Sequence, residues 1–226
     1  MKVSKILGTL TLLLGCIAAV FLTDLPKVIR YRRGDIKDFN MVEFGELQKG
    51  DLVKGTIDWT DGCIAEEEET NSTFGIETSK RTTGRYYAVY TMNGSYLLYQ
   101  TGRENEYKKL DQMGDEAEAY YEARTALEES EGEDADVTLL DTPETTMDFT
   151  GEVIEMPSDL RPIFEKWYGE GFEDECETDI VIRTSNFDRF SWVIYAGAGC
   201  AAGALLMLVL TIMAFVKEKR NQQYGY

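Results

Sequence analysis

Two uncharged apolar stretches lie near opposite ends of this 226-residue chain, and they limit its fold more than any other feature does. The second stretch, residues 192–216, exceeds the ~20 residues that a helix needs to cross the hydrocarbon core of a bilayer. Aromatic and basic side chains at its two ends are typical of membrane interfaces: Trp192, Tyr195, Lys217, Lys219 and Arg220. We therefore predict a transmembrane helix at 192–216 and a short basic cytoplasmic tail at 217–226.

The first stretch, residues 6–22, follows a short basic N-terminus at 1–5 and has two interpretations. It is either a retained span or the apolar core of a cleaved signal peptide. A cleaved signal ends in a small-x-small site, but the best such site, Cys16 and Ala18, lies inside the apolar run. Retention is therefore favoured, and two retained spans place both termini on the same side of the membrane.

The segment between the spans, residues 24–189, carries the negative charge of the chain. It contains 40 Asp and Glu against 18 Lys and Arg, a formal charge of −22. Basic residues near the span ends are more numerous on the loop side, which favours a cytoplasmic loop. However, the positive-inside rule holds only for loops of up to ~60 residues, and long acidic domains are exported regardless of it. We expect a multi-pass plasma-membrane protein with an extracytoplasmic central domain and cytoplasmic termini.

The composition of residues 24–189 indicates a folded, β-rich domain. Aromatic side chains are plentiful and apolar residues recur in short runs, whereas disordered segments are poor in both. Two β-prone runs flank Asn93-Gly94, which is a strong hairpin signature because both residues tolerate positive φ. The predicted strands are 51–59, 63–69, 86–92, 95–100, 147–156 and 178–184.

Two short helices are predicted between the strands. Residues 115–130 begin with Asp115 as a helix cap and Glu118 three residues later, which is the spacing of a capping box. Residues 158–168 carry apolar side chains at i, i+3, i+4 and i+7, and Gly169 can end that helix. The order of elements predicts a membrane-anchored α+β protein, with two transmembrane helices flanking a small barrel, OB-like or sandwich domain.

No motif in the sequence predicts a catalytic, cofactor or metal site, so the catalytic residues are unknown. The chain has no His, so no Ser, Thr or Cys has a His base, and neither central cysteine has the neighbours of a zinc site. The acidic clusters at 66–69 and 128–136 lack the ligand spacing of a calcium loop and are expected to be solvated. Their charge repels phosphate backbones, which excludes nucleic acid as a partner.

The four cysteines fall into two groups. Cys16 and Cys200 lie in the apolar stretches, where they are expected to be small packing residues. Cys63 and Cys176 lie in the central domain, and in an oxidising compartment they could form one disulfide. The sequence does not show whether their Cα atoms come within bonding reach, so the pairing stays open.

Small residues recur at helical spacing in both apolar stretches. Gly199 and Gly203 form a Gly-x3-Gly pair, and Gly15 and Ala19 form a similar pair in the first stretch. Such faces let helix backbones approach closely in lipid. We expect them to pair the spans with each other, with a second copy or with another membrane protein; simple tolerance of small residues in a span is the alternative.

The order of motifs supports a resemblance to a known group of proteins. Residues 44–57 have the pattern Phe-x-x-Leu-x-x-Gly-Asp-x-Val-x-Gly-x-Ile, after a short N-terminal span and before a Tyr-rich hairpin and a C-terminal span. In this arrangement the chain resembles two-span membrane proteins of Gram-positive bacteria that carry a domain of unknown function. The resemblance covers most of the chain and implies an envelope location without implying an activity.

Two functional hypotheses follow. The favoured one is a non-enzymatic interaction or scaffold component of the cell envelope, because catalytic signatures are absent from the sequence. The alternative is a carboxylate-dependent envelope enzyme or ligand-binding module, for example one directed at glycans. A cleft that brings two or more acidic side chains together with exposed aromatics such as Trp59 or Trp167 favours the alternative, whereas a convex domain without a cleft excludes it.

Overall fold

The computed structural model describes residues 3–73, 76–132, 136–187 and 191–223. The chain divides into two compact units. One unit contains both ends of the chain, Met1–Asp35 and Asn186–Tyr226, and the other contains Ile36–Ser185.

Two long apolar helices make up the first unit, as the sequence predicts. They are α1 (Val3–Arg32) and α4 (Ser191–Gln223), and each contains a segment long and apolar enough to cross a membrane, Lys5–Thr23 and Trp192–Arg220. α1 continues through Pro26 and ends ten residues beyond the predicted span. Most of the apolar side chains in both segments are exposed, as expected of surfaces that face lipid.

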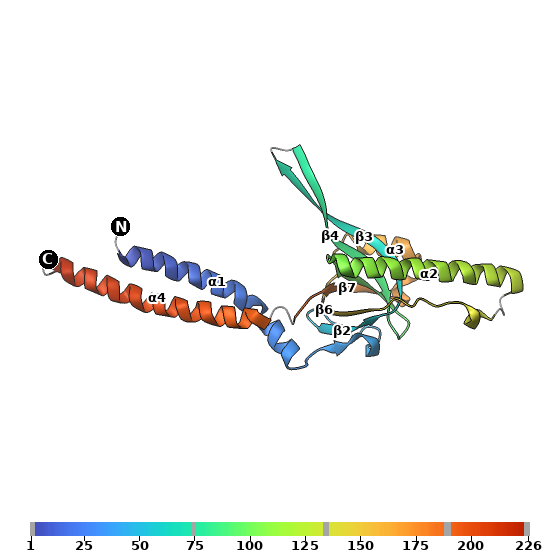
Figure 1. Ribbon diagram of the computed structural model, residues 1–226, viewed down its shortest axis with the longest axis horizontal. Coiled ribbons are helices and arrows are strands. Elements are labelled where there is room, and N and C mark those ends of the chain that lie inside the picture. Colours follow the sequence, from blue (N-terminus) through green and yellow to red (C-terminus); the bar gives the residue numbers. More distant parts are fainter. Residues whose placement is uncertain (1–2, 74–75, 133–135, 188–190, 224–226) are drawn as a thin grey trace. The chain divides into compact units, whose positions relative to one another are not determined.

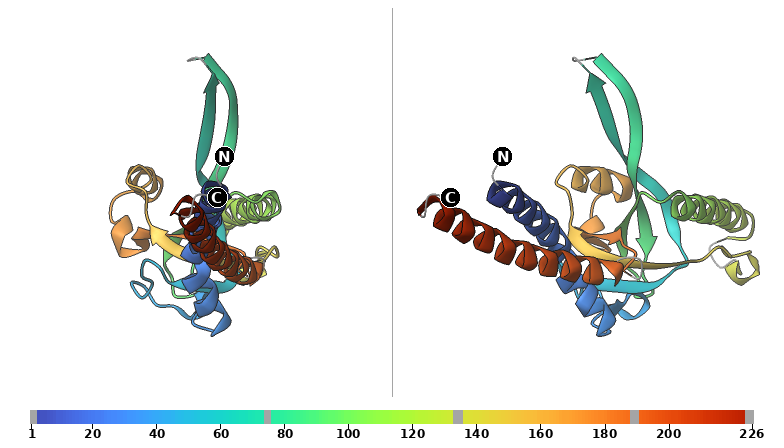
Figure 2. Two further views of the ribbon diagram at one scale, coloured as in Figure 1. Left: turned by 90° about the vertical axis from the view of Figure 1, so that its left-hand side faces the viewer. Right: turned by 60° about the vertical axis from the view of Figure 1, so that its left-hand side comes forward.

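α1 and α4 pack side by side and run in opposite directions, with the N- and C-terminal ends together (Figures 1 and 2). At one end of the pair, the rings of Phe21 and Trp192 meet edge to face at 5.6 Å between centroids. Nearer the termini, the hydroxyl oxygens of Thr11 and Thr211 lie 3.4 Å apart. This antiparallel arrangement places the first turns of α1 beside the last turns of α4.

The second unit is built on a single mixed sheet of seven strands. Their order in the sheet is β1-β2-β6-β7-β5-β4-β3, with parallel pairing only at β1–β2 and β5–β7 among the described pairs. The strands are β1 (Lys37–Asp38), β2 (Leu52–Ile57), β3 (Thr60–Thr73), β4 (Ile76–Tyr90), β5 (Tyr96–Thr101), β6 (Met147–Glu155) and β7 (Cys176–Thr184). The α+β class is therefore confirmed. A closed barrel of the OB type is not confirmed, because the pairing runs from β1 at one edge to β3 at the other.

Each face of the sheet has its own apolar core, because successive side chains of a strand point to opposite faces. Leu97 and Tyr99 of β5 pack with the helix α2 (Glu104–Glu131), whereas Leu98 packs with the helix α3 (Arg161–Tyr168). Three short 3-10 helices lie in the connections: η1 (Phe39–Met41), η2 (Val137–Leu139) and η3 (Phe172–Asp174).

The carboxylate of Glu106 anchors the first turn of α2 to the sheet. It is buried and accepts hydrogen bonds from Tyr99 Oη at 3.0 Å, Thr101 Oγ1 at 2.7 Å, Arg103 Nη1 at 2.7 Å and Thr184 Oγ1 at 3.3 Å. These donors come from β5, from β7 and from the residue that precedes α2. A buried carboxylate with four donors is well compensated, so it fixes the start of the helix.

The largest difference from the sequence prediction concerns α2. The predicted helix begins at Asp115, but α2 begins at Glu104, so Asp115 lies in its middle and is not a cap. The earlier turns are helical because Leu110 and Met113 are fully buried against the sheet. α3 is closer to its prediction: it begins three residues later than expected, at Arg161, and ends at Gly169, whose φ is 87°.

The predicted hairpin is present, and its strands are β4 and β5. Its loop is longer than an Asn-Gly turn, because Thr91 and Ser95 still pair through the bond from Thr91 N to Ser95 O at 2.9 Å. Three residues therefore form the loop, and Gly94 has a φ of 87°.

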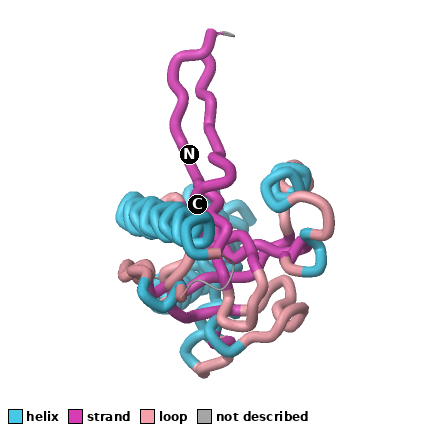
Figure 3. The backbone as a smooth tube through the Cα atoms, turned by 90° about the vertical axis from the view of Figure 1, so that its right-hand side faces the viewer, coloured by secondary structure: helices cyan, strands magenta, loops and turns pink. Residues whose placement is uncertain are grey.

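The β3–β4 pair extends far beyond the sheet as a two-stranded ribbon (Figures 1 and 3). Pairing of β4 with β5 ends at Arg85, whereas pairing of β4 with β3 continues to Ile76. The predicted strand 63–69 covers only half of β3, because the rest of the ribbon lacks the apolar alternation that marks a half-buried strand.

The packing of the two apolar helices gives a first prediction. A Cβ atom added at Gly197 would lie 3.2 Å from Phe21 Cβ, whereas a Cβ atom at Gly199 would meet nothing within 4 Å. We expect Gly197→Ile to separate α1 from α4, because close helix packing in lipid requires small residues at the contact. The measurement is disulfide formation between cysteines introduced at Thr11 and Thr211, in a chain with Cys16 and Cys200 replaced by Ser. Cross-linking should fall several-fold in Gly197→Ile and stay unchanged in the matched control Gly199→Ile. Equal cross-linking in the two variants would contradict the described contact.

Candidate functional site

A cleft of about 840 Å³ lies at the β3 edge of the sheet, between α2 and the start of β3. The first residues of β3 form one wall, successive turns of α2 form the other, and Trp167 of α3 completes it. Its lining contains six carboxylates: Asp61, Asp111, Asp115, Glu118, Glu122 and Glu129. The cleft also contains two aromatic side chains, Tyr121 and Trp167, which are 41% and 50% exposed. Sequence reasoning named Trp167 as an aromatic to look for in such a cleft.

The cleft exists because α2 touches the sheet along only part of its length. At the closest approach, a Cβ atom added at Gly114 would lie 3.3 Å from the Cα atom of Gly62. Gly62 also has a φ of 100°, which favours glycine. Beyond this contact the buried face of α2 ends at Ala117, and residues 121–126 are all exposed. The second half of the helix therefore forms a free wall.

The carboxylates that α2 contributes to the cleft are of two kinds. Asp111 is neutralised by its neighbours, since Arg85 Nη1 lies 2.8 Å from it and Tyr87 Oη donates to it at 2.5 Å. Asp115, Glu118, Glu122 and Glu129 repeat at intervals of three, four and seven residues along one face of α2. Within the part of the chain that the structure describes, these four have no hydrogen-bond or ion-pair partner. Like charges at such spacings repel each other, which makes this helix face electrostatically unfavourable.

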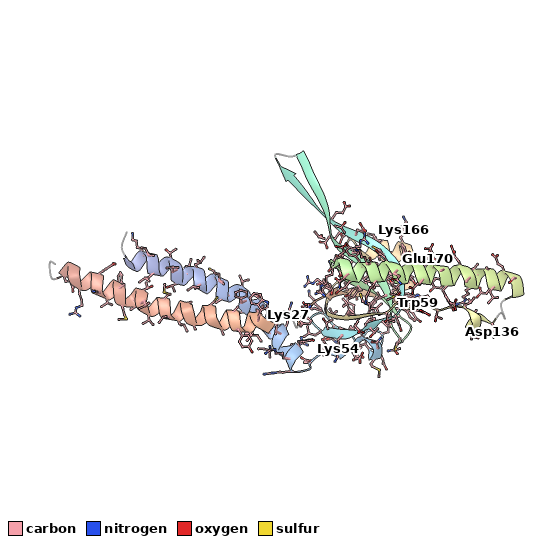
Figure 4. The ribbon with its side chains drawn as sticks, in the orientation of Figure 1. Lys27, Lys54, Trp59, Asp136, Lys166 and Glu170 are labelled. Carbon is pink, nitrogen blue, oxygen red and sulfur yellow. The ribbon has the colours of Figure 1, made fainter. Side chains whose placement is uncertain are left out.

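A second, smaller cavity of about 540 Å³ adjoins the first, and Tyr121 lines both. Aromatic side chains dominate its lining: Trp59, Tyr90, Tyr96, Tyr120 and Tyr121. The Trp59 ring meets the rings of Tyr120 and Tyr121 edge to face at 5.5 and 5.4 Å, and Figure 4 shows Trp59 beside α2. Arg124 lines this cavity, and its charge is paired with Glu128 at 2.7 Å.

Asp61 lines the first cavity and is hydrogen-bonded to Trp59, which lines the second. Its carboxylate accepts a hydrogen bond from Trp59 Nε1 at 3.1 Å and another from Tyr168 Oη at 2.8 Å. Burial raises the pKa of Tyr96, Tyr121 and Tyr168, and in each case the negative charge of Asp61 is the next cause. The phenols therefore stay protonated, and the potential around Asp61 disfavours anions.

Glu116 fixes the loop that borders the second cavity. Its carboxylate accepts hydrogen bonds from the Thr145 hydroxyl at 2.6 Å and from the backbone N–H groups of Thr145 and Glu144 at 2.9 and 3.0 Å. The Thr145 hydroxyl is the main cause that lowers the pKa of Glu116 to about 2. Because Thr142 and Pro143 line the cavity just before these residues, Glu116 positions that wall.

The structure does not bring Cys63 and Cys176 together. Both are free thiols. Cys63 packs against the core on the α2 face of the sheet, whereas Cys176 belongs to the core on the α3 face. The disulfide that the sequence left open is therefore not formed in this structure. Burial raises the pKa of the Cys63 thiol and raises that of Cys176 to about 12, so neither is an activated thiolate.

The small residues of the apolar helices are placed on different sides. Gly203 faces α1, since a Cβ atom there would lie 3.7 Å from Leu14 Cδ1. Gly15 and Gly199 have nothing within 4 Å of such an atom, and Ala19 is exposed. Of the predicted helix-pairing face, only Gly203 therefore lies at the contact between α1 and α4. Pairing through the other three residues with a second copy or another protein stays a prediction.

Most described carboxylates of the acidic clusters at 66–69 and 128–136 form hydrogen bonds or ion pairs with other side chains or backbone groups of the chain. Glu66 pairs with Arg85 at 2.8 Å, and Asp136 accepts hydrogen bonds from Thr138 at the start of η2. Glu133 and Asp134 lie outside the described residues. Among the described residues, no group of three or more His, Cys, Asp or Glu side chains is placed to hold a metal ion.

Sequence reasoning missed the carboxylates that matter most in the cleft. Asp61, Glu118 and Glu122 belong to neither acidic cluster, and Glu118 was interpreted as part of a helix cap. The available signal was the spacing of Asp115, Glu118, Glu122 and Glu129 along one helix face, without an oppositely charged residue four positions away from Glu118.

Comparison with known proteins gave no match: no family model, no curated protein and no solved structure is similar to this chain.

The hydrogen bonds of Glu116 give a prediction about pH. A carboxylate whose pKa is lowered on folding from 4.5 to about 2 stabilises the fold fully above pH 4.5, and this contribution is lost as the pH falls toward about 2. We expect Glu116→Gln to lower the free energy of unfolding at neutral pH, with the difference from the unsubstituted chain shrinking between these two pH values. Urea unfolding at a series of pH values measures this. Glu118→Gln, two residues along the same helix, is the matched control. A difference from the unsubstituted chain that does not change with pH would contradict the described network.

Proposed function

We propose that this chain is a membrane-anchored, non-enzymatic recognition component of the cell envelope, whose Ile36–Ser185 domain binds a basic segment of a partner protein in the acidic cleft. The proposal rests on one observation: four carboxylates without a counter-charge lie along one face of α2 and line an open cleft. Tyr121 and Trp167 in the same cleft offer apolar surface, on which the aliphatic stems of lysine and arginine side chains can pack.

Charge complementarity is the main support for this choice of ligand. The segment 24–189 has a formal charge of −22, and the cleft concentrates part of it between two walls. Clefts lined by one sign of charge focus the field and attract ligands of the opposite sign. A basic ligand would also relieve the repulsion along α2. The only cation that lines either cavity among the described residues, Arg124, is already paired with Glu128.

A carboxylate-dependent module directed at glycans is the second candidate. The observation in its favour is the exposed pair Tyr121 and Trp167 beside carboxylates, because flat aromatic surfaces and carboxylates also suit sugar rings. It ranks lower because Asp61 and Asp111 are each held by two donors from the protein, and the remaining carboxylates lie in a single row along one helix face.

The proposed setting is the plasma membrane of a Gram-positive bacterium, with the acidic domain outside the cell and both termini inside. The hairpin of α1 and α4 supports a common side for the termini. Because α1 packs on α4 along a segment that includes Leu14 and Phe21, the first stretch is proposed to be retained and not cleaved as a signal.

Protease protection tests on which side of the membrane residues 36–185 lie. Intact cells that express the full chain with a C-terminal epitope are treated with trypsin, and the fragments are compared with those from lysed cells. We expect cleavage within residues 36–185 in intact cells, with the epitope protected until lysis. Full protection of these residues in intact cells would place the domain in the cytoplasm and contradict the proposed setting.

Binding is tested with tetralysine as the probe and the full chain in lipid nanodiscs, by isothermal titration calorimetry. We expect binding that weakens steeply with added salt, because exposed charges are screened beyond ~10 Å at 0.1 M ionic strength. The variant with Glu118, Glu122 and Glu129 replaced by Gln should bind at least about tenfold more weakly, which corresponds to ~1.4 kcal/mol.

The matched control removes the same number of charges elsewhere in the domain, by Glu43→Gln, Asp148→Asn and Glu155→Gln, none of which lines either cavity. It should bind tetralysine almost as well as the unsubstituted chain. Equal losses in the two triple variants would show that net charge alone attracts the probe and would contradict a site in the cleft. Binding of chitotetraose in place of tetralysine would favour the glycan-directed candidate.

A further inference from the structure

The carboxylate of Asp61 lines the acidic cleft and lies among several aromatic rings. Asp61, Tyr121 and Trp167 line the same cavity. Behind Asp61, the ring of Tyr168 stacks at a tilt on Tyr96 with centroids 4.8 Å apart, and the ring of Trp59 meets Tyr121. The negative charge of Asp61 is therefore surrounded on several sides by aromatic groups.

Asp61 is held in place without being neutralised. Trp59 Nε1 donates to Oδ1 and Tyr168 Oη donates to Oδ2, so each carboxylate oxygen has one neutral donor. Among the described residues, no Lys or Arg side chain pairs with Asp61. The two neutral bonds fix the orientation of the carboxylate and leave its charge available to a ligand in the cleft.

The aromatic faces add a second attraction for a cation. The π-system of a Trp or Tyr ring attracts cations over its face, and a nearby carboxylate adds to that attraction. The same protein already uses this interaction internally, since the guanidinium of Arg85 lies 4.6 Å from the centroid of the Tyr107 ring. Trp167 is half exposed, so its ring is accessible from the cleft.

An ammonium group suits this arrangement better than a guanidinium. A guanidinium pairs most strongly with a carboxylate when it donates to both oxygens in one plane. At Asp61 both oxygens already accept one bond each, which disfavours that approach. An ammonium is a compact point charge that needs only one remaining acceptor position and a ring face.

We propose that Asp61, Tyr121 and Trp167 form a subsite for an alkylammonium group, filled by a lysine side chain of the partner segment. This inference rests on the proposed function, because it names the part of the basic segment that the cleft selects. The subsite gives the cleft a preference for lysine, whereas the row of carboxylates on α2 attracts any basic chain. The second cavity shares Tyr121 with the subsite and is lined mainly by aromatic side chains.

The experiment uses the full chain in nanodiscs with Trp192 replaced by Phe, so that Trp59 and Trp167 are the remaining tryptophans. n-Butylammonium chloride is titrated, with sodium chloride at matched ionic strength as the reference, and tryptophan fluorescence is recorded. We expect a saturable change with n-butylammonium only. Asp61→Asn should abolish it, whereas Asp148→Asn, outside both cavities, should leave it unchanged.

Trp167→Leu and Trp167→Phe provide a test in which folding is not at risk, because Trp167 is half exposed. In these variants the affinities for tetralysine and tetraarginine are measured by calorimetry. We expect Trp167→Leu to lose most of the preference for tetralysine and Trp167→Phe to keep it. The unsubstituted chain should prefer tetralysine to tetraarginine at least about threefold, or ~0.7 kcal/mol.

The outcomes separate this inference from the proposed function. If tetralysine binding depends on Glu118, Glu122 and Glu129 but n-butylammonium gives no response, the cleft is a general basic site and the subsite is wrong. If n-butylammonium responds through Asp61 while tetralysine does not bind, the subsite stands and the proposed partner segment is wrong. A response to chitotetraose and none to n-butylammonium would overturn the subsite in favour of a sugar.

Discussion

The attachment of α2 to the sheet through Glu106 is the constraint on which the Ile36–Ser185 domain depends. The buried carboxylate of Glu106 accepts hydrogen bonds from β5, from β7 and from the residue before the helix. These bonds fix where α2 starts. Leaving such donors without their acceptor would cost ~1–3 kcal/mol for each buried group, so the arrangement strongly favours a single helix position. From that start, Leu110 and Met113 enter the core, and Gly114 passes directly over Gly62.

The candidate site forms because the buried face of α2 covers only the first half of the helix. Among residues 118–130 of α2, whose burial the structure describes, none is buried, although the helix continues to Glu131. A helix of this length stays folded beyond its packed part through its own hydrogen bonds and through pairs such as Arg124 with Glu128. The unsupported half can therefore carry uncompensated carboxylates toward the cleft, which a helix packed along its whole length could not do.

Aromatic side chains surround Asp61, which lines the cleft. Tyr96, Tyr168, Trp59 and Tyr121 come from four different elements or connections, and their rings meet around Asp61. Because these rings pack against one another, the carboxylate they surround has a fixed orientation before any ligand arrives. Preorganisation of this kind lowers the entropic cost of binding. In the unit of the two apolar helices, close packing depends instead on small residues, with Gly197 and Gly203 at the contact of α1 with α4.

The sequence by itself determined the elements whose signals are local. The two apolar helices follow from runs of uncharged residues, the β4–β5 hairpin from Asn93-Gly94, and the end of α3 from Gly169, because each signal acts within a few residues. Only the tertiary structure decided where α2 begins, because its first turns are polar and become helical through burial of Leu110 and Met113. It also decided the order of the strands, the separation of Cys63 from Cys176 on opposite faces, and the meeting of Asp61 with Tyr121 and Trp167. These features join residues that are distant in sequence, and such contacts are set by packing, which the local pattern of one chain does not encode.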